Sequence, residues 1–143
     1  MDFDALLDKL KHAPGYAGQI VYVREVSARE ARYAEPLRPL TASVRAMLNS
    51  AGIERLYTHQ AEALDHVRDG RDALIVTGAA SGKSLCYILP IIEALEADSE
   101  ARALLLFPTK ALCQDQYRKF TAYLKAAGLD RVLAGVYDGD TPS

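Results

Sequence analysis

The stretch VTGAASGKSLCY, residues 76–87, decides the fold that the sequence predicts. It overlaps the end of the apolar run ALIV at residues 73–76 and leads into apolar residues at helical spacing from Leu85 onward. A loop of small residues that ends in Gly-Lys-Ser, between a buried strand and the start of a helix, is typical of a phosphate-binding loop. Thr77 stands where the commonest form of this pattern has its first glycine. The coincidence of strand, loop, lysine, hydroxyl and helix still predicts a bound phosphate.

The pattern predicts a role for each residue of this loop. Backbone N–H groups from Gly78 to Lys83 would surround phosphate oxygens at the N-terminus of the following helix, where the helix dipole favours negative charge. The ammonium of Lys83 would reach the β- and γ-phosphates, and the hydroxyl of Ser84 would ligate Mg²⁺. We therefore expect Lys83 and Ser84 to be the catalytic residues and Ser84 the metal ligand. The nucleotide would be bound by the whole loop, which comprises Thr77, Gly78, Ala79, Ala80, Ser81, Gly82, Lys83 and Ser84.

Helix-like and strand-like segments alternate along the chain. Apolar residues at helical spacing predict helices at residues 3–10, 41–52 and 58–69, and a further helix after the loop. Short apolar runs predict three strands, at residues 73–76, 103–107 and 132–136. This alternation predicts an α/β fold, in which right-handed crossovers form a parallel sheet with flanking helices.

The composition excludes several classes of protein. The chain has 143 residues, a net charge of −2 and an isoelectric point near 5.9, so it lacks the basic field of a general nucleic-acid binder. Any contact with nucleic acid must then be local. No apolar run is long enough to span a membrane and the first residues do not resemble a secretory signal, so we expect a cytoplasmic protein with no membrane partner. Cys86 and Cys113 lie far apart in helical patterns, which predicts buried free thiols.

Three further segments indicate which kind of phosphate-binding protein this is. RLYTHQAEAL at 55–64 precedes the loop, FPTKALCQDQ at 107–116 follows the second predicted strand, and VYDGDTP at 136–142 follows the third. With the loop, they resemble the first motor domain of superfamily 2 DEAD/DEAH-box ATP-dependent helicases, whose loop often opens with Ala or Thr. SAREARYAEP at 27–36 and the closing YDGDTP narrow the resemblance to DNA-repair helicases of the mitomycin repair factor A type. The resemblance covers residues 18–143.

The resemblance implies a RecA-like P-loop NTPase fold and gives roles to residues outside the loop. Gln60 matches the glutamine of the helicase Q motif, whose amide can accept from and donate to the edge of adenine. Tyr57, one helical turn earlier, would pack against the base. Two short motifs, Ia and Ib, imply contacts with the nucleic-acid backbone and a turn held by Asp side chains. They comprise Pro108, Thr109 and Lys110, and Asp138, Gly139, Asp140 and Thr141.

Ala79 departs from the family pattern, because these loops usually carry threonine at that position. One hydroxyl is therefore missing from the phosphate cradle. Since the backbone N–H groups remain, we expect weakened or altered nucleotide binding and an intact fold.

The resemblance also implies an organisation of the chain. Residues 1–54 would form an N-terminal accessory segment, and residues 55–143 the first part of the motor domain, with the Q motif and motifs I, Ia and Ib. Motif II, D-E-x-H, and everything after it are absent from the sequence, so the expected sheet is incomplete. We therefore expect the ATP-binding part of an ATP-dependent DNA helicase or translocase of DNA repair, with ATP and Mg²⁺ as cofactors.

The expected partners follow from the same resemblance. They are single-stranded or tailed DNA, with RNA left open, and the second motor domain of the intact protein. Taken alone, this part of the protein is expected to be inactive and to self-associate through exposed strand edges.

Two other interpretations stay open at this point. VLAGVYD at 132–138 is an apolar strand that ends in Asp, as does the strand that binds Mg²⁺ in many nucleotide phosphotransferases. If Asp138 were that ligand, the chain would be a compact small-molecule kinase, although YDGDTP and PTKAL favour motif Ib. The other interpretation is a fragment that binds a nucleotide without enzymatic turnover.

Overall fold

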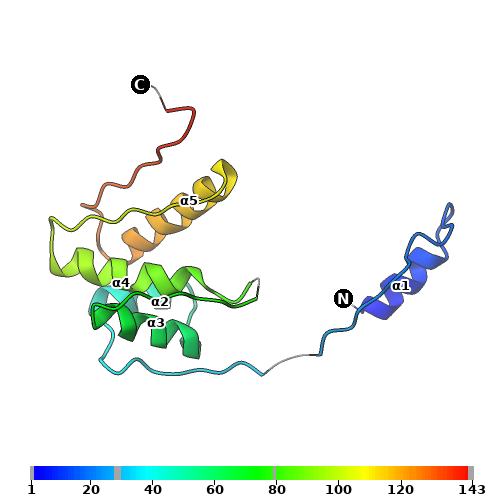
Figure 1. The fold of residues 1–143 in the computed structure, drawn as a ribbon, viewed down its shortest axis with the longest axis horizontal. Coiled ribbons are helices and arrows are strands. Elements are labelled where there is room, and N and C mark those ends of the chain that lie inside the picture. Colours follow the sequence, from blue (N-terminus) through cyan, green and yellow to red (C-terminus); the bar gives the residue numbers. More distant parts are fainter. Residues whose placement is uncertain (1, 28–29, 79, 142–143) are drawn as a thin grey trace. The chain divides into compact units, whose positions relative to one another are not determined.

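The computed structural model describes residues 2–27, 30–78 and 80–141 (Figure 1). The chain forms two compact units, Met1–Glu30 and Ala31–Ser143, which are described separately. This division differs from the boundary at residue 54 that the sequence predicts. The reason is that a helix at residues 42–50 packs against later helices and so lies in the second unit.

The first unit consists of one helix and an extended segment. Helix α1, Phe3–Lys11, begins after Asp2, whose carboxylate accepts hydrogen bonds from the N–H groups of Asp4 and Ala5 at 3.1 and 3.3 Å. The helix predicted at residues 3–10 is confirmed. None of the helices in the described part of the chain is long and apolar enough to cross a membrane.

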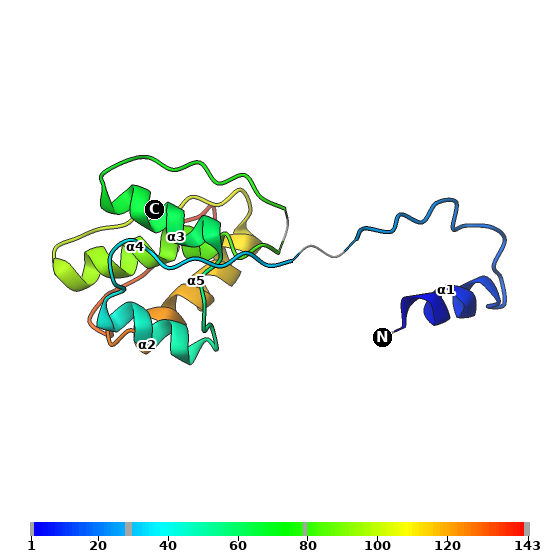
Figure 2. The ribbon, with the colours of Figure 1, turned by 90° about the horizontal axis from the view of Figure 1, so that it is seen from below.

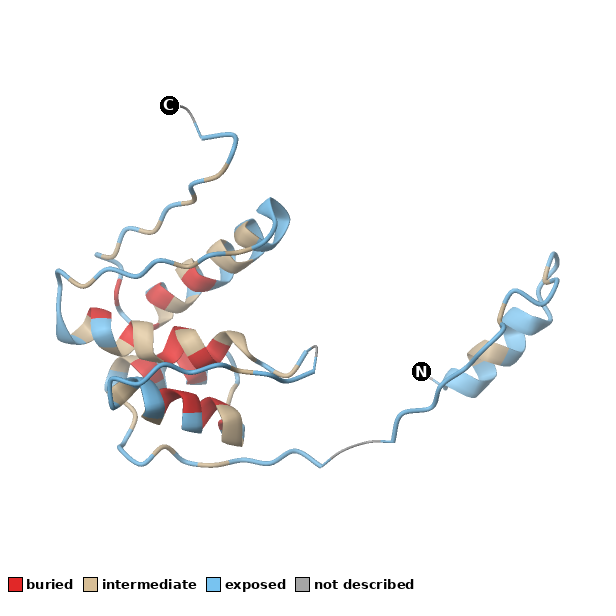
Figure 3. Ribbon diagram, viewed as in Figure 1, coloured by how far each residue is buried: buried red, intermediate tan, exposed pale blue. Residues whose placement is uncertain are grey.

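Four helices form the body of the described second unit: α2 (Ala42–Ser50), α3 (Thr58–Arg68), α4 (Ser84–Ala97) and α5 (Lys110–Ala126). Helix α4 packs against α2 and α3, and α2 also packs against α5 (Figures 1 and 2). Their facing sides form a hydrophobic core, which Figure 3 shows as the buried stretches of these helices. The core includes Met47, Leu64, Ile88, Leu89, Ile92 and Leu124. The predicted helices of this unit are confirmed.

The three predicted strands are extended in the structure, but the described residues form no sheet, so the predicted parallel sheet is not seen among them. An extended segment becomes a strand only when a second backbone lies about 4.8 Å away and pairs with its N–H and C=O groups. Within the described part of the chain, no backbone hydrogen bond joins residues 73–76, 103–107 and 132–136 to one another. The β pairing described there is an isolated antiparallel bridge between Tyr33 and Tyr57.

The side chains of the extended segments nevertheless alternate between half-buried and exposed. Strands whose one face packs on helices show the same alternation. In residues 132–137, Val132, Ala134 and Val136 are half-buried, whereas Leu133 and Tyr137 are 96% and 89% exposed. The half-buried side lies over α4 and α5 around a cavity of about 340 Å³. The outer side is apolar and exposed, and includes Leu74, Val76, Leu104 and Leu106. This is the pattern of a sheet layer whose strands have not paired.

A strap, residues 32–39, runs antiparallel to the segment that enters α3. The N–H of Ala34 donates to the carbonyl of Leu56 at 3.1 Å. The N–H of Thr58 donates to the carbonyl of Arg32 at 3.0 Å. These two bonds fix the strap beside the first turn of α3.

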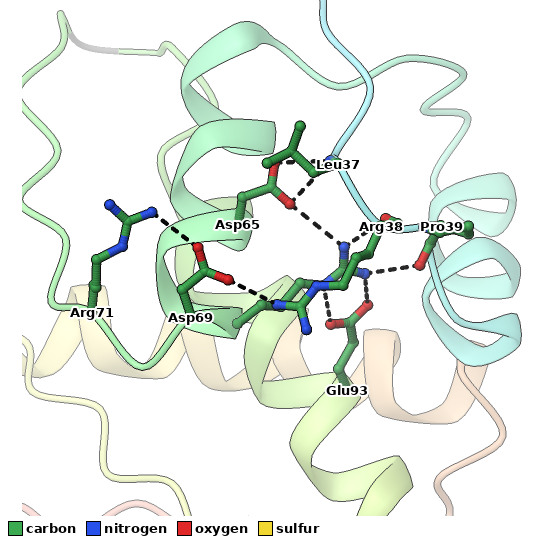
Figure 4. Close-up of polar contacts among 8 residues, drawn as sticks. Leu37, Arg38, Pro39, Asp65, Asp69, Arg71 and Glu93 are labelled. Carbon is green, nitrogen blue, oxygen red and sulfur yellow. Dashed lines mark hydrogen bonds and ion pairs between the residues drawn. The ribbon is translucent and has the colours of Figure 1, made fainter.

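Arg68 of α3 ties the far end of the strap to α4 (Figure 4). Its guanidinium donates to the carboxylate of Glu93 at 2.6 and 2.8 Å, and to two strap carbonyls at 2.6 and 3.0 Å. Asp65, 3.7 Å from Arg68, accepts from the N–H of Leu37 at 2.9 Å. The hydrogen bond to Glu93 raises the pKa of Arg68 above its usual value. Because the side chains of Arg68 and Glu93 are only 10% and 14% exposed, this is a largely buried ion pair that joins three segments.

Candidate nucleotide-binding site

The loop before α4 folds around the ammonium group of Lys83. Nζ of Lys83 donates to the backbone carbonyls of Thr77, at 3.0 Å, and Gly78, and it lies 3.3 Å from the hydroxyl of Ser81. The hydroxyls of Thr77 and Ser81 are hydrogen-bonded at 2.6 Å. The loop thus holds its cation at the N-terminus of α4, where a phosphate would offer the ammonium stronger, charged acceptors.

Two loop residues adopt the left-handed backbone conformation. The φ angle is 56° at Ala80 and 76° at Gly82. A left-handed residue next to a right-handed one turns successive N–H groups toward one side, which is the arrangement of an anion-binding nest. A non-glycine residue in this region stores about 1–3 kcal/mol of strain, so the loop must hold Ala80 in place. Ala79 lies outside the described residues, so its role and the effect of its missing hydroxyl stay predictions.

Gln60 is buried against the loop and is only 2% exposed. Its Oε1 accepts from the N–H of Tyr57 at 2.8 Å, and its Nε2 donates to the carbonyl of Gly82 at 2.9 Å. A Cβ at Gly82 would lie 2.6 Å from Nε2 of Gln60, so this close approach requires glycine. Gln60 therefore links the start of α3 to the phosphate loop. Each of its amide atoms can form one further hydrogen bond, and its adenine contact stays a prediction.

A pocket of about 420 Å³ opens beside the loop, large enough for a nucleotide base. Its lining includes Tyr33, Arg55, Tyr57, Gln60 and Gly82. The ring of Tyr33 stacks on Tyr57 with centroids 5.3 Å apart, and the guanidinium of Arg55 lies 4.3 Å from the centroid of Tyr33. Tyr57 also stacks on His59, at 5.8 Å. Tyr57 thus stacks on two side chains of the protein itself. Its contact with a base stays a prediction.

Ser84, the predicted ligand of Mg²⁺, is the first residue of α4. Its half-buried hydroxyl donates to Oε1 of Gln116 at 3.2 Å. A hydroxyl that donates its hydrogen keeps its lone pairs for a cation. Mg²⁺ prefers oxygen ligands and usually keeps several waters and phosphate oxygens, so a single hydroxyl can serve as the ligand from the protein. The residues at this position fit a metal ion that binds together with a nucleotide.

Motifs Ia and Ib come together at the start of α5. Thr109 is the N-cap of α5, and its hydroxyl accepts from the N–H of Leu112 at 3.2 Å. The next residue, Lys110, forms an exposed ion pair with Asp140 at 2.6 Å. The sequence predicts both motifs as nucleic-acid contacts, and the structure shows that they adjoin.

Motif Ib forms the turn that the sequence predicts. The carboxylate of Asp138 accepts from the N–H of Asp140 at 2.9 Å, and the N–H of Thr141 donates to the carbonyl of Asp138 at 3.0 Å. The oxygen of the Thr141 hydroxyl accepts from the N–H of Asp138 at 2.9 Å, so its hydrogen stays available to a phosphate. Pro108 and Gly139, also predicted as nucleic-acid contacts, are exposed.

Both cysteines are free thiols. Cys86 is buried as predicted, and burial raises the pKa of its thiol. Cys113 is only half-buried, so the prediction of a buried thiol is wrong there, because α5 is less enclosed than α4 at that position.

Three residues near the loop were not predicted from the sequence: Tyr33, Arg55 and Gln116. Tyr33 and Arg55 lie in segments far from the loop motif, and only the strap brings Tyr33 to the pocket. The available signals were that Tyr33 is an aromatic residue within the segment SAREARYAEP and that Arg55 comes just before the Q motif. Gln116 lies at the end of the quoted motif Ia segment, where a polar residue on a helix gives no distinct signal.

A loop with left-handed residues at a helix N-terminus, ending in a lysine and a serine hydroxyl, is typical of a P-loop nucleotide-binding domain. Residues 57–143 match the family model of the DEAD/DEAH box helicases. The chain belongs to this family, whose helicase domains have a RecA-like P-loop fold.

Individual relatives agree with this family. The chain is 40% identical over 122 residues to YprA of Bacillus subtilis, an uncharacterized ATP-dependent helicase, covering 85% of this chain and 16% of the relative. It is 36% identical over 143 residues to ATP-dependent helicase hrq1 of Schizosaccharomyces pombe, covering 97% and 14%. This chain therefore spans about one-sixth to one-seventh of these two relatives.

A solved structure supports the narrower resemblance. The DUF1998 helicase MrfA bound to DNA and AMPPNP matches with a TM-score of 0.79 and 37% identity, covering 97% of this chain and 19% of that one. The resemblance to the mitomycin repair factor A type is thereby confirmed.

Proposed function

We propose that this chain is the ATP-binding part of an ATP-dependent DNA helicase or translocase that acts in DNA repair. The observation that carries the proposal is the hydrogen bond from Gln60 to the carbonyl of Gly82. This bond supports the proposal because Gln60, proposed to read the base edge, lies beside the loop proposed to hold the phosphates. DNA as the substrate is supported by MrfA, which was solved bound to DNA. The role in repair rests on the resemblance to the mitomycin repair factor A type.

Each loop residue has its own proposed role in the hydrolysis of ATP. Gly82 lets the backbone approach the phosphates, and Lys83 neutralises charge that develops on the γ-phosphate during its transfer to water. Bound Mg²⁺ would neutralise further charge on the phosphate oxygens. Ser84 offers the metal its hydroxyl oxygen. Within the described residues, no carboxylate forms a hydrogen bond or ion pair with Lys83 or Ser84. The carboxylate proposed to orient the attacking water belongs to the D-E-x-H motif, which this sequence does not contain.

The proposed DNA contacts are Thr109, Lys110 and Thr141. The N-terminus of α5 and the two hydroxyls offer donors to backbone phosphates, which requires no basic patch. The ion pair of Lys110 with Asp140 is exposed and contributes little net stability, so a phosphate can replace Asp140 as the partner of Lys110. These local contacts are compatible with the acidic net charge of the chain.

The sheet of the RecA-like fold is proposed to form when further strands pair with the three extended segments. The support is their exposed apolar outer side, on which Leu74 is 90% and Leu104 84% exposed. Unpaired, apolar extended segments attract other chains. In the intact protein, a second motor domain would close over the nucleotide, whereas the isolated chain is expected to self-associate through these segments.

We expect the purified 143-residue chain to hydrolyse no ATP above background, with or without single-stranded DNA. The reason is that the sequence contains no D-E-x-H motif to supply the carboxylate that orients the attacking water. Phosphate release measures this activity, and light scattering after size-exclusion chromatography measures the expected oligomers. Steady turnover that is lost in Asp138→Asn would instead support the small-molecule kinase.

Base preference tests the role of Gln60. We expect the wild-type chain to bind ATP more tightly than GTP by about 1–3 kcal/mol, and Gln60→Ala to lose this preference while still binding triphosphates. The variant also loses a cap of α3, which lowers the free energy of unfolding by about 1 kcal/mol. Competition titrations with the two nucleotides give the preference, and Gln114→Ala on the exposed side of α5 is the control. A wild-type chain with equal affinities for both nucleotides would contradict this role.

The second candidate function is a nucleotide-binding fragment without turnover. The absence of a D-E-x-H motif from this sequence favours it for this chain in isolation, and the hydrolysis assay separates it from an active enzyme. The family assignment argues against the small-molecule kinase. The carboxylate of Asp138 is also engaged within its own turn, at the N–H of Asp140.

A further inference from the structure

Gln116 of α5 reaches the first turn of α4 at the predicted metal ligand. Its Oε1 accepts hydrogen bonds from the hydroxyl of Ser84 at 3.2 Å and from the hydroxyl of Tyr87 at 2.8 Å. Its Nε2 donates to the carboxylate of Asp115 at 3.1 Å. The half-buried amide therefore joins α4 and α5 beside the phosphate loop.

The hydrogen bond from Ser84 determines how its oxygen is presented. A serine hydroxyl has one hydrogen and two lone pairs. When the hydrogen points at Gln116, the lone pairs face away from the amide and stay available to a cation. Residues that orient a metal ligand in this way typically change the metal affinity by about 10- to 100-fold when they are replaced.

The neighbours of Gln116 keep its amide in this orientation. Tyr87 donates to the same oxygen as Ser84, and Asp115 accepts from the nitrogen. A flipped amide would place its oxygen against the carboxylate of Asp115, which is unfavourable. Lys119 lies 2.7 Å from Asp115, and its hydrogen bond lowers the pKa of that carboxyl, which keeps it ionised.

We propose that Gln116 is a positioning residue that orients the hydroxyl of Ser84 for the Mg²⁺ ion that binds with the nucleotide. The proposal rests on the proposed function, because it requires nucleotide binding at the loop. Gln116 acts through Ser84 and contacts neither the nucleotide nor the metal. Its replacement should therefore weaken nucleotide binding only when Mg²⁺ is present.

The test is a Mg²⁺ titration of the binding of a fluorescent ATP analogue to the 143-residue chain. Gln116→Leu should raise the Mg²⁺ concentration for half-maximal enhancement of binding about tenfold, and should leave the affinity in EDTA unchanged. Leucine is as good a helix former as glutamine, so α5 should persist. Gln114→Leu makes the same change at an exposed position of α5 and should leave both quantities unchanged.

Two further variants test whether Gln116 acts through Ser84. In a Ser84→Ala background, Gln116→Leu should cause no additional change in the Mg²⁺ dependence, because the hydroxyl that it orients is gone. Tyr87→Phe keeps the ring but removes one donor to the amide, and should shift the Mg²⁺ dependence in the same direction by less than Gln116→Leu. If circular dichroism shows that Gln116→Leu is unfolded, Tyr87→Phe carries the test.

The possible results separate this role from the proposed function. If the wild-type chain shows Mg²⁺-dependent binding and both Gln116→Leu and Tyr87→Phe match it, the positioning role is overturned and the proposed function stands. An equal loss of affinity in EDTA and in Mg²⁺ also overturns it, because the effect would then be structural. A wild-type chain that binds no nucleotide at any Mg²⁺ concentration overturns the proposed function and this role with it.

Discussion

Replacing Lys83 with alanine is expected to lower the affinity of the chain for Mg·ATP about 100-fold, which would put binding beyond detection in a fluorescence titration. The ammonium is held at the loop by the carbonyls of Thr77 and Gly78, next to the N–H groups that would bind phosphate. Its removal deletes charge-assisted hydrogen bonds to the β- and γ-phosphates, each worth about 1.5–3 kcal/mol.

The control for this variant is Lys125→Ala. Lys125 lies in the last turn of α5 and is exposed, so its replacement makes the same change in net charge away from the loop. It should bind Mg·ATP as the wild-type chain does. An unchanged affinity in Lys83→Ala would show that the loop is not the phosphate site.

Replacing Arg68 with methionine is expected to lower the free energy of unfolding by about 3 kcal/mol, because it leaves the carboxylate of Glu93 largely buried without its partner. The strap loses two hydrogen bonds to its carbonyls at the same time. The urea midpoint, followed by circular dichroism, should fall by about 1–3 M. A chain of marginal stability would be unfolded by this change without urea.

A matched variant separates the buried pair from an exposed one. Arg71 pairs with Asp69 at 3.0 Å, but both side chains are about half-exposed. Arg71→Met should therefore change the free energy of unfolding by less than about 1 kcal/mol. Adding Glu93→Gln to Arg68→Met should recover part of the loss, because it removes the unpaired charge. Equal, small effects of Arg68→Met and Arg71→Met would contradict the structural role of Arg68.

The helices could be predicted from the sequence because their signals are local. Thr41 and Thr109 cap α2 and α5 through their hydroxyls, at 3.4 and 3.2 Å from the N–H groups that they accept from. The buried residues of α2 and α4 follow the helical spacing of apolar residues in the sequence. Pairing into a sheet is a different kind of property, because it does not follow from a local signal. Residues 103–107 have the apolar composition of a buried strand, but pairing requires another backbone at the correct distance.

The candidate site likewise has a part that could be predicted from the sequence and a part that could not. The loop from Thr77 to Ser84 is a contiguous motif, so its residues could be identified by their order alone. The burial of Gln60 against Gly82 joins residues far apart in the sequence, and depends on how α3 packs against α4. The link from Gln116 to Ser84 depends in turn on the position of α5. No periodicity or spacing in the sequence reports such contacts.

The central claim is that the loop before α4 binds ATP, with the base in the pocket beside Gln60. Isothermal titration calorimetry of the wild-type chain with AMPPNP in Mg²⁺ tests it most directly. We expect saturable binding with one site per chain, about 5- to 150-fold tighter than that of the corresponding guanine nucleotide. A titration with no saturable heat, or with equal affinities for the two nucleotides, would contradict it.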